Sequence, residues 1–266
     1  MPNSSAPRPL KHFFTALQFF TRLPIPAGIG FEPEWLRHAA GYFPLTGLVV
    51  ALLQCALYWV ASRLLPAPVP IVMALIAGVY LTGALQEDGF ADVCDGFGGG
   101  TTRERILEIM KDSRVGAYGV TGIVLLLTFK CLLLAEMPSS LVISALLLAH
   151  PLSRCCAATL IWRLDYARIG ESKAKAVAQE LSSADYGIAL GTTLTVAGLL
   201  GASGALPWGA IGIGTLCAGG IACWLTRKFV RRIGGYTGDC LGAIQQVSEV
   251  AVYIGLLAFA HLSGVH

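Results

Sequence analysis

Long apolar segments that alternate with short polar connections dominate this chain. Seven of them approach the length of about 20 residues that a helix needs to cross a bilayer: 42–64, 69–85, 117–134, 141–162, 186–201, 208–225 and 250–262. The second and the fifth are short for a span. The pattern predicts an all-α fold in a single domain, 1–266: a polytopic integral membrane helix bundle with about seven transmembrane helices.

Two further segments have the pattern of amphipathic helices. HFFTALQFF places Phe13, Leu17 and Phe20 on one side, and two prolines follow. It predicts an N-terminal interfacial helix within the segment 1–40, and its cationic end carries Arg22, which could reach a substrate phosphate. RERILEIMK, capped by Thr101 or Thr102, predicts a second amphipathic helix on the membrane or on the bundle.

Composition strengthens the membrane assignment. With 55% hydrophobic residues, 13% charged residues and a mean hydropathy of +0.67, the chain is too apolar for an ordinary soluble domain of 266 residues. The eight cysteines form no CxxC pair and lie mostly in apolar segments, so we expect small hydrophobic roles for them. The net charge of +3 favours a lipid bilayer and phosphorylated substrates as partners, with no nucleic acid.

Basic residues gather before the first span and in every second connection between spans, and this alternation predicts an orientation. Connections near 66–70, 136–140 and 201–207 contain no Lys or Arg, and neither does the C-terminal tail. The positive-inside rule then puts the N-terminus and the long loops in the cytoplasm and the C-terminus outside the cell (inner) membrane. The basic groups are Arg8, Lys11, Arg22 and Arg37; Arg103, Arg105, Lys111 and Arg114; Arg163, Arg168, Lys173 and Lys175; and Arg227, Lys228, Arg231 and Arg232.

Charged residues inside apolar segments are costly and mark sites of interest. Lys130 lies near the outer end of its segment, where it can snorkel to the surface. Arg154, close to Pro151 in segment 141–162, predicts either a substrate-binding group or a structural pairing with a carbonyl or carboxylate. Gly187 and Gly191 stand at GxxxG spacing, which predicts tight helix packing within the bundle or in a homo-oligomer.

The densest polar chemistry lies in the segment 86–116, a predicted cytoplasmic active-site loop. Asp88, Asp92 and Asp95 are spaced i, i+4, i+7, so a helix that continues from the second span would carry them on one narrow face. Three like charges there repel one another unless a cation lies among them. A hard divalent ion such as Mg²⁺, which takes oxygen ligands and keeps room for substrate phosphate, fits this set.

Basic and acidic residues follow in the same segment, in KDSR. Lys111 and Arg114 are natural phosphate partners, while Asp112 could orient one of them, join the metal site, or accept a proton from a hydroxyl group.

A second predicted active-site loop, 227–249, contains GGYTGDCLGAIQQVSE. Asp239 lies in its glycine-flanked turn and could complete the metal site begun by the triad. Gln246 and Glu249 share a face with it if a helix begins there.

Carboxylates ringed by Lys and Arg at one end of a membrane bundle suggest a membrane enzyme that acts on a diphosphate. A rival is another Asp-rich membrane transferase, such as a CDP-alcohol phosphotransferase or a polyprenyl transferase; the former should show DGxxAR, which DGFAD does not match. An ion-coupled transporter is a rival from a different class, although no inverted repeat is evident.

Five motifs occur along the chain in this order: FTRLPIP, YFPLTG, DGFADVCDG, RILEIMKDSRVGAYG and GGYTGDCLGA. Together they resemble the cobalamin synthase, or adenosylcobinamide-GDP ribazoletransferase, family. The resemblance implies transfer of the phosphocobinamide group from adenosylcobinamide-GDP to α-ribazole or its 5′-phosphate, with release of GMP and a need for Mg²⁺.

The resemblance also implies site residues. It implies metal ligands at Asp88, Asp92, Asp95 and Asp239, catalytic groups at Lys111, Asp112 and Arg114, and substrate contacts at Ser113, Thr237 and Gly238. We add Arg22 and Arg154 as substrate-binding candidates. Two departures stand out: Gln86 and Glu87 replace the family's His-Leu, and Gln246 replaces its usual Glu.

Overall fold

The computed structural model describes residues 7–26, 29, 35–167 and 181–264, and their regular structure is helical. An isolated parallel bridge joins Tyr166 to Tyr236. The elements are α1 (Arg8–Phe20), α2 (Leu36–Ala39), the 3-10 helix η2 (Ala40–Tyr42), α3 (Phe43–Ala61), α4 (Val69–Thr82), α5 (Leu85–Gly99), α6 (Arg103–Ile109), α7 (Ala117–Ala135), α8 (Ser139–Arg163), α10 (Ser183–Ala202), α11 (Trp208–Ile233) and α12 (Gly238–Leu262).

The predicted membrane bundle is confirmed, with five or six candidate spans among the described residues against the seven predicted. Ala40–Ala61, α7, α8, α11 and α12 each have the length and hydropathy to cross a bilayer. α8 and α12 are the central helices, since 78% and 72% of their most apolar windows are buried. α10 forms where the fifth span was predicted, but it is not among the candidates; glycines and threonines interrupt its apolar side chains.

The predicted continuous helix from the second span into the acidic triad is wrong. α4 ends at Thr82 and α5 starts at Leu85, and the axes of the two helices are bent by 88° relative to one another. The break comes from Gly83 and Ala84, which both adopt left-handed backbone angles, with φ of 64° and 59°. An α-helix cannot pass through two such residues, so the acidic helix bends away from the span.

The two predicted active-site loops are mostly helical. Segment 86–116 contains most of α5, all of α6 and the loop before α7. Segment 227–249 contains the end of α11, a tight connection at 234–237 and the first half of α12. As predicted, the hydroxyl of Thr102 caps α6 by accepting a hydrogen bond from the backbone N–H of Arg105 at 3.2 Å. The four predicted metal ligands therefore stand on helices, whereas the KDSR residues, 111–114, lie in the loop before α7.

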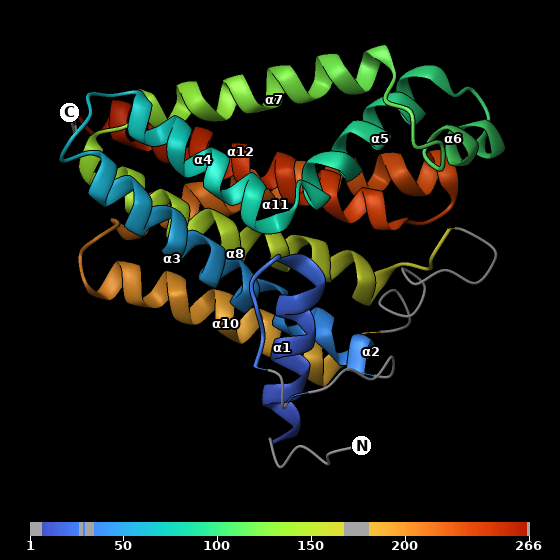
Figure 1. The fold of residues 1–266 in the computed structure, drawn as a ribbon, viewed down its shortest axis with the longest axis horizontal. Coiled ribbons are helices and arrows are strands. Elements are labelled where there is room, and N and C mark those ends of the chain that lie inside the picture. Colours follow the sequence, from blue (N-terminus) through green and yellow to red (C-terminus); the bar gives the residue numbers. More distant parts are fainter. Residues whose placement is uncertain (1–6, 27–28, 30–34, 168–180, 265–266) are drawn as a thin grey trace.

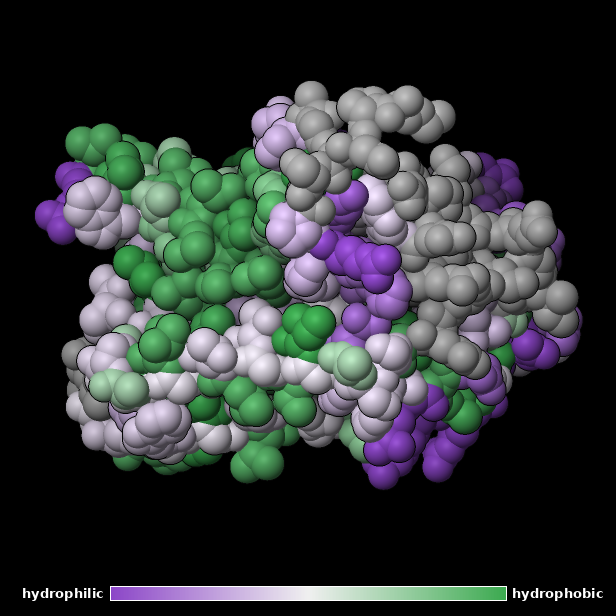
Figure 2. Space-filling model, turned by 90° about the horizontal axis from the view of Figure 1, so that it is seen from below, coloured by the Kyte–Doolittle hydropathy of each residue, from purple (hydrophilic) through white to green (hydrophobic). Residues whose placement is uncertain are grey.

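Connections fall alternately at the two ends of the bundle (Figure 1). The α3–α4, α7–α8 and α10–α11 connections and the C-terminus lie at the left end, whereas α5, α6 and the α11–α12 connection lie at the right. Among these connections, those with basic residues and those without them thus lie at opposite ends of the bundle, as the charge pattern predicted. Which end faces the cytoplasm stays a prediction. Hydrophobic side chains cover much of the left half of Figure 2, and hydrophilic ones gather in the centre and toward the right end. The basic residues predicted at 168–175 lie outside the described residues, as do residues 1–6, 27–28 and 30–34 of the predicted 1–40 segment.

Two cations join helices at the right end of the bundle. Arg103 of α6 donates from Nε to the carbonyl of Ile233, at 2.9 Å, and from a terminal guanidinium nitrogen to the carbonyl of Ala167, at 3.0 Å. Arg232 of α11 donates to the carbonyl of Gly100 at 2.8 Å. The contacts with Ile233 and Gly100 satisfy carbonyl groups at the ends of α11 and α5.

Among the described residues, the predicted packing face of Gly187 and Gly191 meets no neighbouring helix. Added Cβ atoms at Gly187, Gly191, Gly198, Gly212 and Gly219 would meet no heavy atom within 4 Å among the described residues. Close approach occurs elsewhere, at glycines of α5 and α12. The prediction of a homo-oligomer stays a prediction.

Candidate active site

A cavity of about 170 Å³ lies where α5 meets the first turn of α12. Side chains of α1, α3 and α8 close its remaining walls. Asp88 on α5 and Asp239 on α12 both line it. The structure thus brings together in one cavity two of the four predicted metal ligands, from motifs that are far apart in the sequence.

Two glycines allow α5 and α12 to approach closely enough for this. A Cβ added at Gly89 would lie 3.0 Å from the Cα of Asp239, and one added at Gly242 would lie 2.9 Å from the carbonyl oxygen of Gln86. Backbone atoms cannot yield as a flexible side chain can. A side chain at either position would therefore separate the helices that carry Asp88 and Asp239.

The TGD motif forms the start of α12. Thr237 is its N-cap: the buried hydroxyl accepts from the backbone N–H of Cys240 at 3.4 Å and donates to the carboxylate of Asp239 at 3.3 Å. Asp239 lies in the first helical turn, where the helix dipole favours negative charge, and Gly238 lines the cavity. The motif's sequence thus folds to present Asp239.

The other two aspartates of α5 do not line this cavity. The buried carboxylate of Asp95 accepts hydrogen bonds from the backbone N–H groups of Gly116, at 2.7 Å, and Gly119, at 2.8 Å. It therefore satisfies orphan donors at the start of α7. Asp92 is half-buried one turn earlier. Across the described ranges, no three His, Cys, Asp or Glu side chains gather as a metal site.

The carboxylate pair at the cavity fits Mg²⁺ by its chemistry. Magnesium in enzymes is commonly bound through one or two carboxylates together with substrate phosphate oxygens, instead of through a cage made wholly of protein. Asp88 and Asp239 supply such a pair.

The KDSR element forms part of the loop between α6 and α7. Arg114 donates to both carboxylate oxygens of Asp112 from Nε and from a terminal nitrogen, at 3.0, 3.1 and 2.6 Å. Hydrogen bonds from the Arg114 side chain and backbone lower the pKa of Asp112 to about 2. Lys111 and Ser113 are exposed beside this pair. Of the roles open to Asp112, orientation of Arg114 is the one that the structure shows.

Arg22 lies at the bend between α4 and α5. Its backbone N–H donates to the carbonyl of Leu81 at 2.7 Å, and its guanidinium lies 5.6 Å from the ring centre of Tyr80. A Cβ added at Gly83 would lie 2.8 Å from its Nε atom. The side chain is exposed and does not line the acidic cavity, so its predicted substrate contact is untested.

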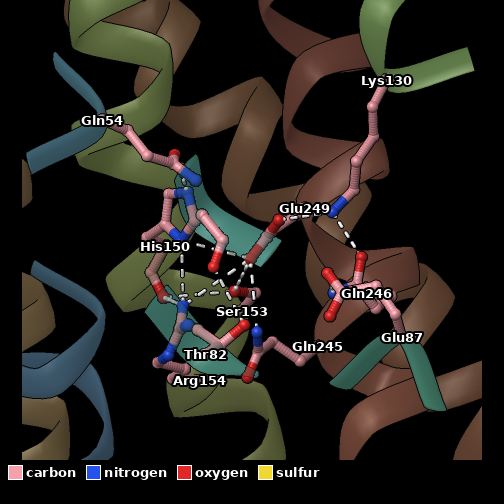
Figure 3. Close-up of polar contacts among 11 residues, drawn as sticks. Gln54, Thr82, Glu87, Lys130, His150, Ser153, Arg154, Gln245, Gln246 and Glu249 are labelled. Atoms are coloured by element: carbon pink, nitrogen blue, oxygen red, sulfur yellow. Dashed lines mark hydrogen bonds and ion pairs between the residues drawn. The ribbon is translucent and has the colours of Figure 1, made fainter. Parts of the chain in front are cut away.

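A second polar cluster lies buried between the central helices (Figure 3). Lys130 of α7 forms an ion pair with Glu249 of α12 at 2.6 Å and also donates to the amide oxygen of Gln246. The other oxygen of Glu249 lies 3.4 Å from His150 and 3.6 Å from Arg154, both on α8. These side chains line a cavity of about 20 Å³, which is the size of a single water site.

The buried cluster corrects one prediction and shows the structural part of another, while the predicted substrate contact of Arg154 stays a prediction. Lys130 is 3% exposed and paired with Glu249, so the predicted snorkelling is wrong. Snorkelling requires an open path to the interface, and here α12 offers a carboxylate instead. For Arg154 the structure shows the predicted pairing: it donates to the carbonyl of His150 at 3.1 Å and faces Glu249.

Gln246 connects this cluster to the acidic helix. Its amide nitrogen donates to Glu87 of α5 at 2.8 Å, while its amide oxygen accepts from Lys130. The neutral residue that departs from the family pattern therefore links a cation to a carboxylate. A glutamate at position 246 would bring a third carboxylate close to those of Glu87 and Glu249.

Sequence reasoning had missed the pairing of Lys130 with Glu249 and the positions of Gln86 and Glu87. The signal available in the sequence was an isolated cation, Lys130, in the apolar segment of α7 and an isolated carboxylate, Glu249, in that of α12. An isolated charge in a membrane segment nearly always has a partner. Which partner it takes depends on helix packing that the sequence pattern does not specify.

The fold and the site together define a polytopic helical membrane protein with a diacidic cavity at one end of its bundle. The model of one family, cobalamin-5-phosphate synthase (CobS), matches residues 12–257. The chain belongs to this family.

Curated relatives of similar length match nearly the whole chain. A protein of Leptothrix cholodnii named adenosylcobinamide-GDP ribazoletransferase is 43% identical over 254 residues, which cover 92% of this chain and 94% of the relative. Proteins with the same name from Shewanella frigidimarina and Ralstonia pickettii are 41% and 44% identical, covering 94% and 92% of this chain and 95% and 94% of their own. No solved structure matches the chain.

Proposed function

We propose that this protein is an adenosylcobinamide-GDP ribazoletransferase of the membrane. The ribose hydroxyl of α-ribazole, or of its 5′-phosphate, attacks the phosphorus that bears the cobinamide. A new P–O bond forms, the P–O bond to GMP breaks, and GMP leaves while the hydroxyl proton is released. Family membership supports this reaction, and the observation that carries the site is the shared cavity of Asp88 and Asp239.

In this proposal Asp88 and Asp239 hold Mg²⁺ together with the substrate's diphosphate, and Asp92 lies one turn along the same helix. The ion offsets negative charge on the phosphoryl oxygens when it is bound. Asp95 uses its oxygens to fix the start of α7. This assignment keeps the predicted acidic set but divides it between ion binding and the positioning of a helix.

Lys111 and Arg114 then bind phosphate oxygens from the loop before α7. A guanidinium can present two parallel N–H groups to a phosphate, whereas an ammonium acts as a point charge. Asp112 is a poor proton acceptor near neutral pH, because its pKa is about 2. We therefore assign it the orientation of Arg114, not proton transfer.

The proposed active site faces the cytoplasm of a cell membrane. Basic residues of α6, α11 and the α6–α7 loop lie at the same end of the bundle as the acidic cavity, and positive-inside charge puts that end in the cytoplasm. Water-soluble nucleotide substrates would reach the cavity from there.

The test is turnover by purified protein in lipid nanodiscs, supplied with adenosylcobinamide-GDP, α-ribazole and Mg²⁺. GMP release and cobamide formation are read by mass. Asp88→Asn and Asp239→Asn remove one cavity carboxylate each. Asp165→Asn, an exposed aspartate that does not line the cavity, is the matched control.

We expect the wild type and Asp165→Asn to form cobamide, and the two cavity variants to lose at least about 100-fold in kcat. Wild-type protein that releases no GMP under these conditions would refute the proposed reaction. Full turnover by both cavity variants would be consistent with the proposed reaction but would refute the placement of the active site at Asp88 and Asp239.

A further inference from the structure

The cavity that Asp88 and Asp239 line also has an aromatic wall. Phe19 and Phe20 of α1 and Phe43 of α3 line it. The rings of Phe20 and Phe43 pack edge to face with centroids 4.2 Å apart, and those of Phe19 and Phe20 do so at 4.8 Å. Such a wall suits a flat, apolar ring system.

Gln86 adds one polar group to this wall. It is 3% exposed, and its amide nitrogen has no hydrogen-bond partner among the described residues. Buried donors nearly always have a partner, so this one calls for an acceptor. Gln86 also borders the small cavity beside Glu249, but that space of about 20 Å³ has room for a water molecule at most. Of the two cavities that Gln86 lines, the larger one is therefore the one with room for a ligand that accepts from it.

Cavity size and wall chemistry limit what that ligand is. Pockets that enclose whole small molecules measure roughly 300–1,000 Å³, whereas this one measures about 170 Å³. It suits one ring system of a larger substrate. A guanine base presents several donors and acceptors along its edge and needs several polar partners. The other polar side chains of the lining are already engaged: Asp88 and Asp239 in the proposed ion site, and Gln245 through the hydrogen bond that its amide nitrogen donates to Glu249 at 3.4 Å. A dimethylbenzimidazole base has a hydrocarbon edge and a single ring nitrogen that accepts a hydrogen bond.

We propose that this cavity binds the benzimidazole base of the α-ribazole substrate, with the base against Phe20 and Phe43 and its free ring nitrogen accepting from the amide of Gln86. The inference rests on the proposed function and names the substrate half that this wall recognises. The ribose hydroxyl then lies on the side of the cavity that carries Asp88 and Asp239.

The test is equilibrium binding of radiolabelled α-ribazole to the protein in nanodiscs, without the second substrate and without Mg²⁺, so that binding is measured apart from turnover. GMP binding is measured in parallel as the guanine arm. Gln86→Leu removes the donor at similar volume, Phe20→Ala removes a ring, and Phe20→Tyr keeps it. Gln18→Leu on the exposed face of α1 and Phe129→Ala on the exposed face of α7 are the matched controls.

We expect Gln86→Leu to raise the Kd for α-ribazole about 3- to 10-fold and Phe20→Ala to raise it about 5- to 100-fold. Phe20→Tyr and both controls keep the wild-type value, and no variant changes GMP binding by more than about 2-fold. This pattern would also separate a binding role from a folding role, because a misfolded variant would lose both ligands.

Three results overturn the inference. The first is wild-type protein that does not bind α-ribazole. The second is an unchanged Kd in both Gln86→Leu and Phe20→Ala, which would leave Gln86 with a structural water. The third is loss of GMP binding with α-ribazole binding intact, which would assign the wall to guanine. If the wild type forms cobamide while the second or third result holds, the proposed function survives and this inference alone fails.

Discussion

Replacing Lys130 by Met should destabilise the folded protein by about 2–3 kcal/mol. The Lys130 ammonium lies 2.6 Å from Glu249, with both side chains 4% exposed. At an effective dielectric constant of about 20, Coulomb attraction at this distance is about 6 kcal/mol. Relief of the ammonium's desolvation, which costs several kcal/mol, offsets roughly half of that loss.

Removing the carboxylate should cost more than removing the ammonium. Glu249 faces Arg154 at 3.6 Å as well as Lys130, so Glu249→Gln leaves two buried cations without their shared partner. We expect about 4–5 kcal/mol, the upper end of the range for breaking a buried ion pair. In Lys130→Met, by contrast, Glu249 keeps Arg154. The double variant should be more stable than the sum of the two losses implies, by at least about 1.5 kcal/mol.

Unfolding by SDS in mixed micelles, followed by far-ultraviolet circular dichroism, gives the free energies of unfolding of the wild type, Lys130→Met, Glu249→Gln and the double variant, which together form a double-mutant cycle. Lys228→Met is the matched control, because Lys228 is exposed and contacts only aromatic rings among the interactions described for it; it should change stability by less than about 1 kcal/mol. A Lys130→Met variant within about 0.5 kcal/mol of wild type, or strictly additive losses in the double variant, would refute the reasoning.

Three further predictions follow from contacts around the cavity. Gly242→Ala, whose Cβ would lie 2.9 Å from the carbonyl oxygen of Gln86, should cost about 1–3 kcal/mol in SDS unfolding and lower turnover, whereas Gly187→Ala, with nothing within 4 Å, should be neutral or slightly stabilising; equal effects would argue against the close contact. Asp95→Ala leaves the N–H groups of Gly116 and Gly119 without their acceptor and should increase hydrogen exchange at the start of α7, measured by mass spectrometry, with Asp165→Asn as the unaffected control. Arg114→Ala should move the carboxyl titration of Asp112 from about 2 up toward 3.8, measured by carbon NMR of labelled aspartate. Because the folded pKa is the lower one, any stability from this pair is present above pH 4 and is lost as the pH falls toward 2; an unchanged midpoint would contradict the assigned cause.

The sequence predicted the parts of the fold that depend on local pattern. Apolar length indicated the helices of the bundle, and the alternation of basic connections indicated which ends lie together. The bend after Thr82 was missed, since only Gly83 of its two left-handed residues is of a type that adopts this conformation readily. A tertiary contact borders the bend, the hydrogen bond from the backbone N–H of Arg22 to the carbonyl of Leu81 at 2.7 Å, and local propensity does not describe such a contact.

The candidate site was predictable as a set of residues but not as an arrangement. Periodicity put Asp88, Asp92 and Asp95 on one helical face, yet Asp88 lines the cavity while Asp95 accepts backbone N–H groups of α7. A spacing pattern states which side chains share a helix face. It does not state which neighbouring helix each one meets, and that choice decides between a ligand and a helix cap.

The buried ion cluster and the acidic cavity are mechanically linked through α5. Glu87 points toward the cluster, where it accepts from Gln246, and the next residue, Asp88, lines the cavity. Gln246 in turn lies beside Lys130 and one helical turn before Glu249. Because α5 leaves α4 at a sharp bend, it lacks the support of a continuous span. The contact of Glu87 with Gln246 therefore adds a polar attachment to the close packing of α5 on α12, directly beside the residue that lines the cavity, Asp88.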